Sequence, residues 1–190
     1  MNPVYLRSNN IVLRDWILED LDRYKYWLEP KHEWHNLDGP YYRLTPDEAK
    51  IKIFHLRHNL EKNIFPDPRP QLVIADKNTN ELMGLVSSYW QSKETFWLSA
   101  GLSLFDPATW KNGYGFEAAQ LWVDYLFQHH NEIVRLDFRT WSGNQGMIKL
   151  ALKLGFKEEA RFRDARIVNG KYYDGLAFGI LRSEWNVKKN

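Results

Sequence analysis

A glycine turn in front of an apolar helical segment is the feature of this sequence best suited to bind a ligand. The turn reads Trp110-Lys111-Asn112-Gly113-Tyr114-Gly115 and follows Asp106-Pro107, where a strand is expected to end. Two glycines two positions apart let backbone N–H groups converge, and the N-terminus of the following helix adds partial positive charge. Lys111 adds a full charge on a mobile side chain. The turn therefore predicts a site for a phosphate or pyrophosphate.

Other uses of such a turn are only partly excluded by the residues around it. Gly-x-Gly before a helix is also common in tight turns that bind nothing. A Walker loop needs a Gly-Lys-Ser/Thr ending, which is missing here. A dinucleotide-binding turn needs a third glycine or an alanine, and Ala118 stands at that spacing. That class is disfavoured because the turn lies in mid-chain after four expected strands, with no acidic residue evidently placed for a ribose.

Composition narrows the remaining chemistry. The chain has 190 residues, a formal net charge of +2 and no cysteine. A cysteine nucleophile, disulfides and thiolate–zinc sites are therefore excluded, and a cytoplasmic location is expected. The small charge argues against nucleic acid as a partner. The start lacks the apolar segment of a secretory signal, and no apolar run approaches the roughly 18 residues of a membrane span, so no membrane association is expected.

With thiolate ligands excluded, two pairs of histidines are the candidates for a metal site. His32 and His35 flank Glu33 three residues apart, and His55 and His58 share a helical spacing. Neither pair fits the His-Glu-x-x-His zinc pattern, so no metal site is predicted. The segment from His32 to His35 is instead a candidate border of a substrate site. Asp164 and Arg166, before the turn Asn169-Gly170, are expected to be charged strand residues, with substrate contact as the alternative.

The elements that must position the glycine turn follow from apolar periodicity and turn residues. Strands are expected at seven places: 11–16, 71–75, 82–89, 96–104, 134–140, 157–162 and 172–181. Helices are expected at 18–28, at about 46–60 after a capping box of Thr45 and Glu48, at 114–129 and at 147–154. Residues 29–44 are expected to form a loop. The order predicts one α/β (α+β) domain over 1–190, with a mixed sheet and helices on both faces.

Four blocks of the sequence together resemble the GNAT acetyltransferase superfamily, in particular its ribosomal-protein-alanine and polyamine N-acetyltransferase branch. These blocks are Ile11-Val12-Leu13-Arg14-Asp15-Trp16 with Glu19-Asp20-Leu21, then 106–118 around the glycine turn, then Asn144 to Phe156, and finally Gly179 to Trp185. The resemblance covers nearly the whole chain, and the order and spacing of the blocks are far more specific than the turn alone.

The resemblance implies a mostly antiparallel sheet of about seven strands that is splayed at its centre, with acetyl-CoA between strands 96–104 and 134–140. Backbone groups of Leu102, Ser103 and Leu104 would bind the pantetheine arm. Asn144 would face that arm. The pyrophosphate would be held by the amides of Lys111, Asn112, Gly113, Tyr114, Gly115 and Phe116.

Three positions depart from the family pattern. Trp110 stands where the motif usually begins with Gln or Arg. Ala151 stands where many members carry a tyrosine suited to protonate the leaving thiolate. A glutamate that acts as base in relatives is replaced in the register by Ser99, Ala100 and Gly101. The general acid and general base are therefore open.

The predicted reaction is direct attack of an amine on acetyl-CoA, since no cysteine can form an acyl-enzyme. A backbone N–H near Leu102 would meet the developing oxyanion, and the enzyme would act mainly by positioning. Ser99 and Asn144 are the candidate catalytic residues, with an ordinary strand serine as the alternative for Ser99. The acceptor is a protein N-terminus or a small-molecule amine, and the protein is a monomer or homodimer. A catalytically silent CoA-binding module and a protein binding another nucleotide are the competing hypotheses.

Overall fold

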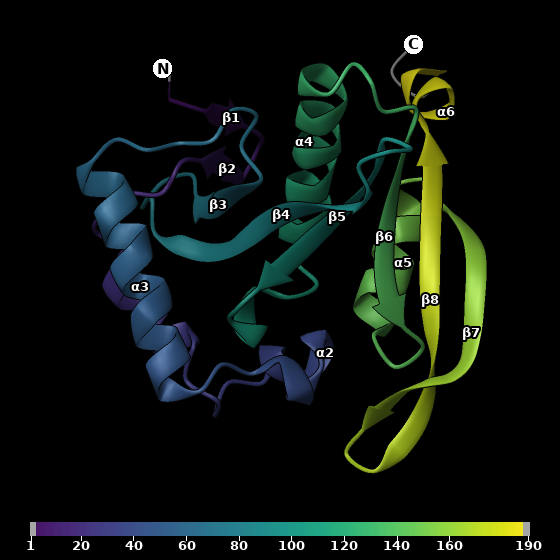
Figure 1. The fold of residues 1–190 in the computed structure, drawn as a ribbon, viewed down its shortest axis with the longest axis horizontal. Helices are drawn as coiled ribbons and strands as arrows, with labels where there is room; N and C mark the ends of the chain where they lie inside the picture. Colours follow the sequence, from purple (N-terminus) through teal and green to yellow (C-terminus); the bar gives the residue numbers. More distant parts are fainter. Residues whose placement is uncertain (1–2, 188–190) are drawn as a thin grey trace.

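Eight strands form one open sheet in the computed structural model, which describes residues 3–187 (Figure 1). Neighbours in the sheet follow the order β1-β2-β3-β4-β5-β6-β8-β7, and only β5 and β6 run parallel. The strands are β1 (Tyr5–Arg7), β2 (Ile11–Arg14), β3 (Gln71–Asp76), β4 (Leu82–Ser92), β5 (Trp97–Leu104), β6 (Arg135–Trp141), β7 (Lys157–Val168) and β8 (Lys171–Leu181). The mixed, mostly antiparallel sheet is confirmed. The ends of the predicted domain, 1–2 and 188–190, lie outside the described residues.

Six α-helices accompany the sheet within the described part of the chain. They are α1 (Asp20–Trp27), α2 (Trp34–Asp38), α3 (Pro46–Glu61), α4 (Tyr114–His129), α5 (Gln145–Lys153) and α6 (Arg182–Val187). Two 3-10 turns, η1 (Pro40–Tyr42) and η2 (Pro107–Thr109), precede α3 and α4 respectively. The predicted helices are all present, and α4 has the predicted bounds.

The sequence-based expectations miss four features. Strand β1 and helices α2 and α6 were not predicted, because three to six residues carry too little periodicity to stand out. Residues 29–44, expected as a loop, contain α2 and η1. Strand β7 continues to Val168 instead of ending at 162, because an irregularity between Phe162 and Arg166, with Asp164 at φ 52°, lets pairing resume.

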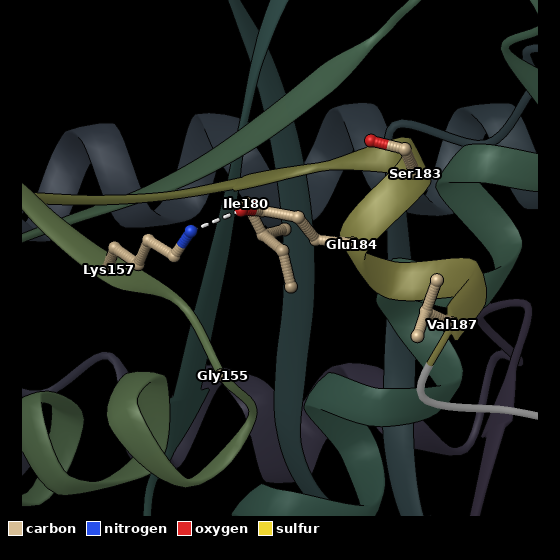
Figure 2. A pocket seen from close by; sticks show the side chains of 6 residues that line it. All are labelled: Gly155, Lys157, Ile180, Ser183, Glu184 and Val187. Atoms are coloured by element: carbon tan, nitrogen blue, oxygen red, sulfur yellow. Dashed lines mark hydrogen bonds and ion pairs between the residues drawn. The ribbon is translucent and has the colours of Figure 1, made fainter.

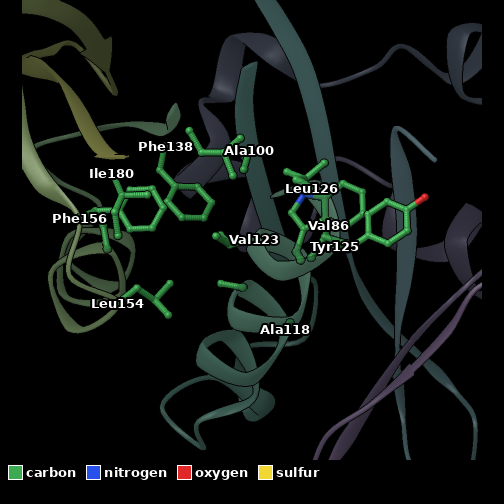
Figure 3. Packing of buried hydrophobic residues seen from close by; sticks show 14 of the residues in the cluster. Val86, Ala100, Ala118, Val123, Tyr125, Leu126, Phe138, Leu154, Phe156 and Ile180 are labelled. Atoms are coloured by element: carbon green, nitrogen blue, oxygen red, sulfur yellow. The ribbon is translucent and has the colours of Figure 1, made fainter. Parts of the chain in front are cut away.

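Helices pack on both faces of the sheet, as predicted, and each face carries a buried cluster, whereas most of β7 is exposed. In β2, Ile11 and Leu13 pack in the cluster that includes α4, whereas Val12 packs in the cluster that includes α1. The alternation follows from the two-residue period of a strand. Figure 3 shows the first cluster, with Val123 and Ala118 of α4 facing Phe138 and Ala100 of the sheet. This packing fixes α4, and with it the glycine turn, against β5.

The start of α3 gives a first stability prediction. The Thr45 hydroxyl accepts a hydrogen bond from the Glu48 amide at 3.3 Å, and the Glu48 carboxylate accepts one from the Thr45 amide at 2.7 Å. This is the predicted capping box. Thr45→Ala is expected to lower the free energy of unfolding by about 1 kcal/mol, measured by urea denaturation. Thr95→Ala, in the exposed turn after β4, is the control. Equal midpoints for the two variants would contradict the role of the cap.

None of the helices within residues 3–187 is long and apolar enough to cross a membrane.

Candidate functional site

A large cavity opens where β5 and β6 separate. The two strands pair in parallel over only three positions, from Leu98↔Leu136 to Ala100↔Phe138. Beyond them β5 stays paired with β4, up to Gly84↔Leu104, while β6 stays paired with β8, up to Trp141↔Gly175. The facing edges of β5 and β6 therefore diverge toward α2 (Figure 1). The predicted central splay is present.

This cavity has a volume of about 1240 Å³ and draws its lining from segments distant in sequence. The lining includes Ala100–Leu104 of β5, Phe138–Trp141 of β6, five residues of 110–116, Gly143–Met147 before and in α5, and Trp34, Leu37, Asp38 and Tyr42 around α2. Leu102, Ser103 and Leu104 all line it. Because the β6-facing edge of β5 has lost its strand partner here, backbone groups of this segment are available to an extended ligand.

The glycine turn forms one end of the cavity. Lys111 and Gly113 both have positive φ, at 64° and 87°, and Gly113 is the N-cap of α4. The first bonds of the helix run from the Phe116 and Glu117 amides to the Gly113 carbonyl, at 3.0 and 3.1 Å. The amides before them belong to the first turn, whose N–H groups have no intrahelical acceptor. Amides and helix dipole thus converge on this end of the cavity.

The residues of the turn differ in where their side chains lie. Lys111, Gly113, Gly115 and Phe116 line the cavity, with Trp110 beside them. The Asn112 side chain donates to the Ala108 carbonyl at 3.2 Å, and the Tyr114 side chain packs against the core. Any role of these two residues in binding therefore rests on their backbone.

The structure gives a reason for the residue types at positions 110 and 115 of the turn. The Trp110 indole donates to the Leu104 carbonyl at 3.0 Å, which ties the turn to the end of β5. A Cβ on Gly115 would lie 3.2 Å from Leu150 Cδ1 and 3.4 Å from Leu102 Cδ2. Glycine at 115 therefore permits close packing of α4 on β5 and α5.

Positive charge gathers near the turn. Lys149 and Lys153 of α5 line the same cavity as Lys111, and the Lys153 ammonium lies 4.3 Å from the centre of the Phe116 ring. The ammonium groups and the first-turn amides favour an anionic ligand at this end.

Asn144 lines the cavity, and its side chain also has a structural role. Its amide oxygen accepts from the Met147 amide at 3.0 Å, which caps α5, and its nitrogen donates to the Leu37 carbonyl at 3.4 Å. The Trp141 indole donates to the same carbonyl at 2.8 Å. Asn144 thus joins α5 to α2 at the edge of the cavity.

Ser99 is fully buried in the short stretch where β5 and β6 still pair, and it does not itself line the cavity. Its hydroxyl donates to the Asp137 carboxylate of β6. Tyr89, its cross-strand neighbour on β4, does line the cavity. Ala151 is buried in the core, so the tyrosine of many relatives has no counterpart on α5.

The opposite end of the cavity is built from α2, η1 and the β7–β8 hairpin. Glu33 and Trp34 line it, whereas the side chains of His32 and His35 bond back to the carbonyls of Tyr26 and Glu29. Within residues 3–187 no group of three or more acidic or histidine side chains is arranged to hold a metal.

Charged groups at this end come from distant segments. Arg166 of β7 reaches the cavity and donates to the Tyr41 hydroxyl at 2.9 Å. Burial raises the pKa of the Asp38 carboxyl, while Arg166 nearby lowers it. Burial also lowers the pKa of His35. Sequence reasoning missed Tyr89 and Asp38, which line the cavity, and Asp137, which is fully buried beside Ser99 and does not line it. All three are placed by contacts between segments far apart in the sequence.

A second hollow lies beside α6. Figure 2 shows its lining by Gly155, Lys157, Ile180, Ser183, Glu184 and Val187. Lys157 and Glu184 form an ion pair across it. It is shallow and apolar and holds none of the predicted site residues.

Comparison with known proteins places the chain in a family. The family model for the acetyltransferase (GNAT) domain matches residues 10–157. A curated relative, the SPbeta prophage-derived uncharacterized N-acetyltransferase YokL of Bacillus subtilis, is 26% identical over 114 residues, which is 60% of this chain and 63% of the relative. The matched region thus spans less than two thirds of that relative's length.

Solved structures share the fold. RimL, a ribosomal L7/L12 alpha-N-protein acetyltransferase in complex with coenzyme A, superposes with a TM-score of 0.71 at 16% identity, over 95% of this chain and 98% of that one. The spermidine/spermine N-acetyltransferase SpeG of Vibrio cholerae superposes with a TM-score of 0.70 at 17% identity, over 95% and 98%. The splayed sheet, the glycine turn and the matching family model lead to one conclusion: this chain belongs to the GNAT acetyltransferase family.

Proposed function

We propose that the protein transfers the acetyl group of acetyl-CoA to an amine. The observation that carries the proposal is the unpartnered edge of β5, which faces a cavity that ends at the amides before α4. A long, thin ligand with an amide-rich arm and a pyrophosphate fits both features. The complex of RimL, a protein of the same fold, with coenzyme A supports the proposal.

The residues present fit acetyl-CoA along the whole cavity. The backbone of Leu102, Ser103 and Leu104 would pair with the pantetheine arm in the manner of an added strand. The amides from Lys111 to Gly115 would hold the pyrophosphate, with Phe116 lining the cavity beside them, and Lys111 would add charge. The Phe116 amide itself is bonded to the Gly113 carbonyl. When bound, acetyl-CoA supplies an activated acetyl group as a thioester. Asn144, at the edge of the cavity, is proposed to face the arm.

The amine is proposed to enter from the end near α2. Trp34, Tyr42 and Trp141 give this end an aromatic lining, and Asp38 adds a carboxylate. Aromatic faces and a carboxylate both attract a cationic ammonium group. A protein N-terminus or a small-molecule amine fits this lining.

The amine is proposed to attack the thioester directly, without an acyl-enzyme. The sequence holds no cysteine, so a thiol acyl-enzyme cannot form. A backbone N–H near Leu102 would stabilise the developing oxyanion, because that part of β5 has no partner on one edge. Holding the amine and the donor at the same point of the splay supplies much of the rate.

The direct test is a panel of amines assayed for acetyl-CoA-dependent release of CoA thiol. The panel contains spermidine, an alanine-terminated peptide, an aminoglycoside and a small amino acid. At least one amine is expected to give thiol and acetylated product in equal amounts, with the product identified by mass spectrometry. Acetyl-CoA binding without acetylation of any amine would favour a catalytically silent CoA-binding module, for which the alanine at position 151 is the motivating observation.

Lys111 gives a binding prediction of modest size. Its side chain is exposed and lines the pyrophosphate end of the cavity. An exposed charge contributes up to about 1 kcal/mol, so Lys111→Gln is expected to weaken acetyl-CoA binding by about fivefold. Isothermal titration calorimetry at low and high salt measures this, with a smaller effect expected at high salt. Lys171→Gln, at the start of β8 and outside the cavity, is the control, and equal affinities of the two variants would count against the predicted contact.

A further inference from the structure

Three polar side chains form a row across the sheet at the base of the splay. Tyr89 of β4 is the direct partner of Ser99 of β5, and Ser99 is the direct partner of Asp137 of β6. Directly opposed residues place their side chains on the same face of the sheet, with Cβ atoms about 5 Å apart. The row lies within the short stretch where β5 and β6 still pair, immediately before they diverge. It therefore borders the point at which the cavity begins.

Asp137 is an unusual residue for its place. Its side chain is fully buried in the middle of the sheet. One carboxylate oxygen accepts from the Ser99 hydroxyl, and the other accepts from the Trp97 indole at 2.7 Å. The Arg139 guanidinium lies 3.7 Å from the second oxygen. A buried carboxylate is costly unless it is paired and hydrogen-bonded, and these three groups meet that need.

The hydrogen bonds give the row a direction. Ser99 has one hydroxyl proton, and it donates that proton to Asp137. Tyr89, the cross-strand neighbour of Ser99, interacts with the Ser99 side chain. Because the Ser99 proton is given to Asp137, the Tyr89 hydroxyl is assigned as the donor in this interaction and the Ser99 oxygen as the acceptor. The phenol oxygen of Tyr89 then keeps lone pairs free, and Tyr89 is the member of the row that lines the cavity. The row ends at the cavity in a hydrogen-bond acceptor that is connected to a buried carboxylate.

The surroundings of Tyr89 keep its hydroxyl protonated. Burial is the largest effect and raises the pKa of the Tyr89 phenol, and the negative charge of Asp137 raises it further. Ser99, Arg139 and Gln91 lower it by smaller amounts. The net shift is upward, so the phenol is neutral near neutral pH. A neutral phenol can give its proton to Ser99 at the moment it receives another.

We propose that Tyr89 accepts the proton of the attacking amine, and that Ser99 and Asp137 are the positioning residues that carry it away from the cavity. The inference rests on the proposed acetyl transfer. As the amine nitrogen bonds to the acetyl carbon, the carbon–sulfur bond breaks and its electron pair goes to sulfur. The nitrogen gives a proton to the Tyr89 oxygen, Tyr89 gives its own to Ser99, and Ser99 gives its own to Asp137. Asp137 ends as the neutral acid, and the relay returns the proton to solvent after the products leave.

Removal of the Tyr89 hydroxyl is the first test. Tyr89→Phe is compared with Tyr172→Phe, an exposed tyrosine of the β7–β8 hairpin that lies outside the cavity. With the most active amine of the panel, Tyr89→Phe is expected to lower kcat by about 100-fold, which is the usual contribution of general base catalysis. The acetyl-CoA affinity by calorimetry and the thermal midpoint are expected to match those of Tyr172→Phe.

For Ser99 and Asp137 the test is the pH dependence of kcat, which would not change if these residues only stabilised the fold. In the wild type, kcat is expected to be flat around neutral pH, because Asp137 takes the proton. In Ser99→Ala and Asp137→Asn, kcat is expected to rise steadily with pH, because hydroxide must take the proton instead. Asp137 and Arg139 are the charged groups that face Tyr89 from β6. Should Asp137→Asn fail to fold, Ser99→Ala gives the decisive profile.

A measurement without turnover tests the surroundings of Tyr89. Tyrosinate absorbance is titrated in the wild type, Tyr89→Phe and Tyr172→Phe. The signal lost in Tyr89→Phe is expected at a pH above the ordinary range of a tyrosine pKa, and a signal at or below that range would contradict the proposed row.

The outcomes separate this inference from the acetyl transfer itself. If the wild type acetylates an amine and Tyr89→Phe keeps kcat within about twofold, the relay is wrong and the acetyl transfer stands. If the wild type binds acetyl-CoA but acetylates no amine of the panel, both the relay and the transferase activity are wrong. Flat pH profiles in both Ser99→Ala and Asp137→Asn would overturn the positioning role.

Discussion

Gly113→Asp is expected to weaken acetyl-CoA binding by at least about 100-fold, because it places a carboxylate among the amides proposed to hold the pyrophosphate. Two like charges about 4 Å apart near a protein surface repel by several kcal/mol, which is enough for this loss. Gly113 lines the cavity and is the N-cap of α4. Calorimetry with acetyl-CoA measures the affinity directly.

The matched control is Gly113→Asn. Gly113 has φ 87°, a conformation that asparagine and aspartate tolerate better than other side chains, and a Cβ built there meets no atom within 4 Å. The two variants differ by a charge and little else, so their thermal midpoints are expected to agree. Asparagine is expected to cost no more than about fivefold in affinity. Equal affinities for the two variants would mean that the pyrophosphate lies elsewhere.

Asp20→Ala is expected to have the largest effect on stability, lowering the free energy of unfolding by about 3–5 kcal/mol. Arg14 and Asp20 form a bidentate pair, with N–O distances of 2.7 and 2.8 Å, and their side chains are 5% and 3% exposed. Asp20 also accepts from the Ile17 amide at 2.9 Å, which sets the start of α1. Loss of the carboxylate leaves the Arg14 charge buried without its partner.

Asp22→Ala separates the buried pair from a general effect of removing an acid. Asp22 lies in the same first turn of α1 but is exposed. Its loss is expected to cost less than about 1 kcal/mol, the usual size of an interaction between an exposed acid and a helix N-terminus. Urea denaturation measures both variants. Similar losses would show that the Arg14–Asp20 pair adds nothing beyond the helix dipole.

The proposed donor half of the site could be predicted from the sequence because it is local in the chain. The glycine turn, the first residues of α4 and the end of β5 all lie within 102–116. Helix α4 was predicted with its true bounds because sixteen residues repeat one apolar face and start at a glycine turn.

Most residues of the proposed relay and of the proposed amine entrance could not be predicted, because they are brought together by pairing between strands that are far apart in sequence. Asp137 stands between Arg135 and Arg139 at alternating positions of one strand, so by sequence it looks like part of a solvated face. Only the pairing of β6 with β5 shows that its side chain is buried against Ser99. Tyr89 and Asp38 likewise reach the cavity through the sheet and through α2, a helix too short to be predicted.

The most direct test of the account is amide hydrogen exchange with and without acetyl-CoA. Exchange is expected to slow in two separate segments, 102–104 at the unpartnered edge of β5 and 111–116 at the start of α4. The distant turn at 169–170, between β7 and β8, is expected to exchange equally in both states. Saturable binding with protection confined to other segments, or no binding at concentrations well above micromolar, would contradict the placement of acetyl-CoA between β5 and β6.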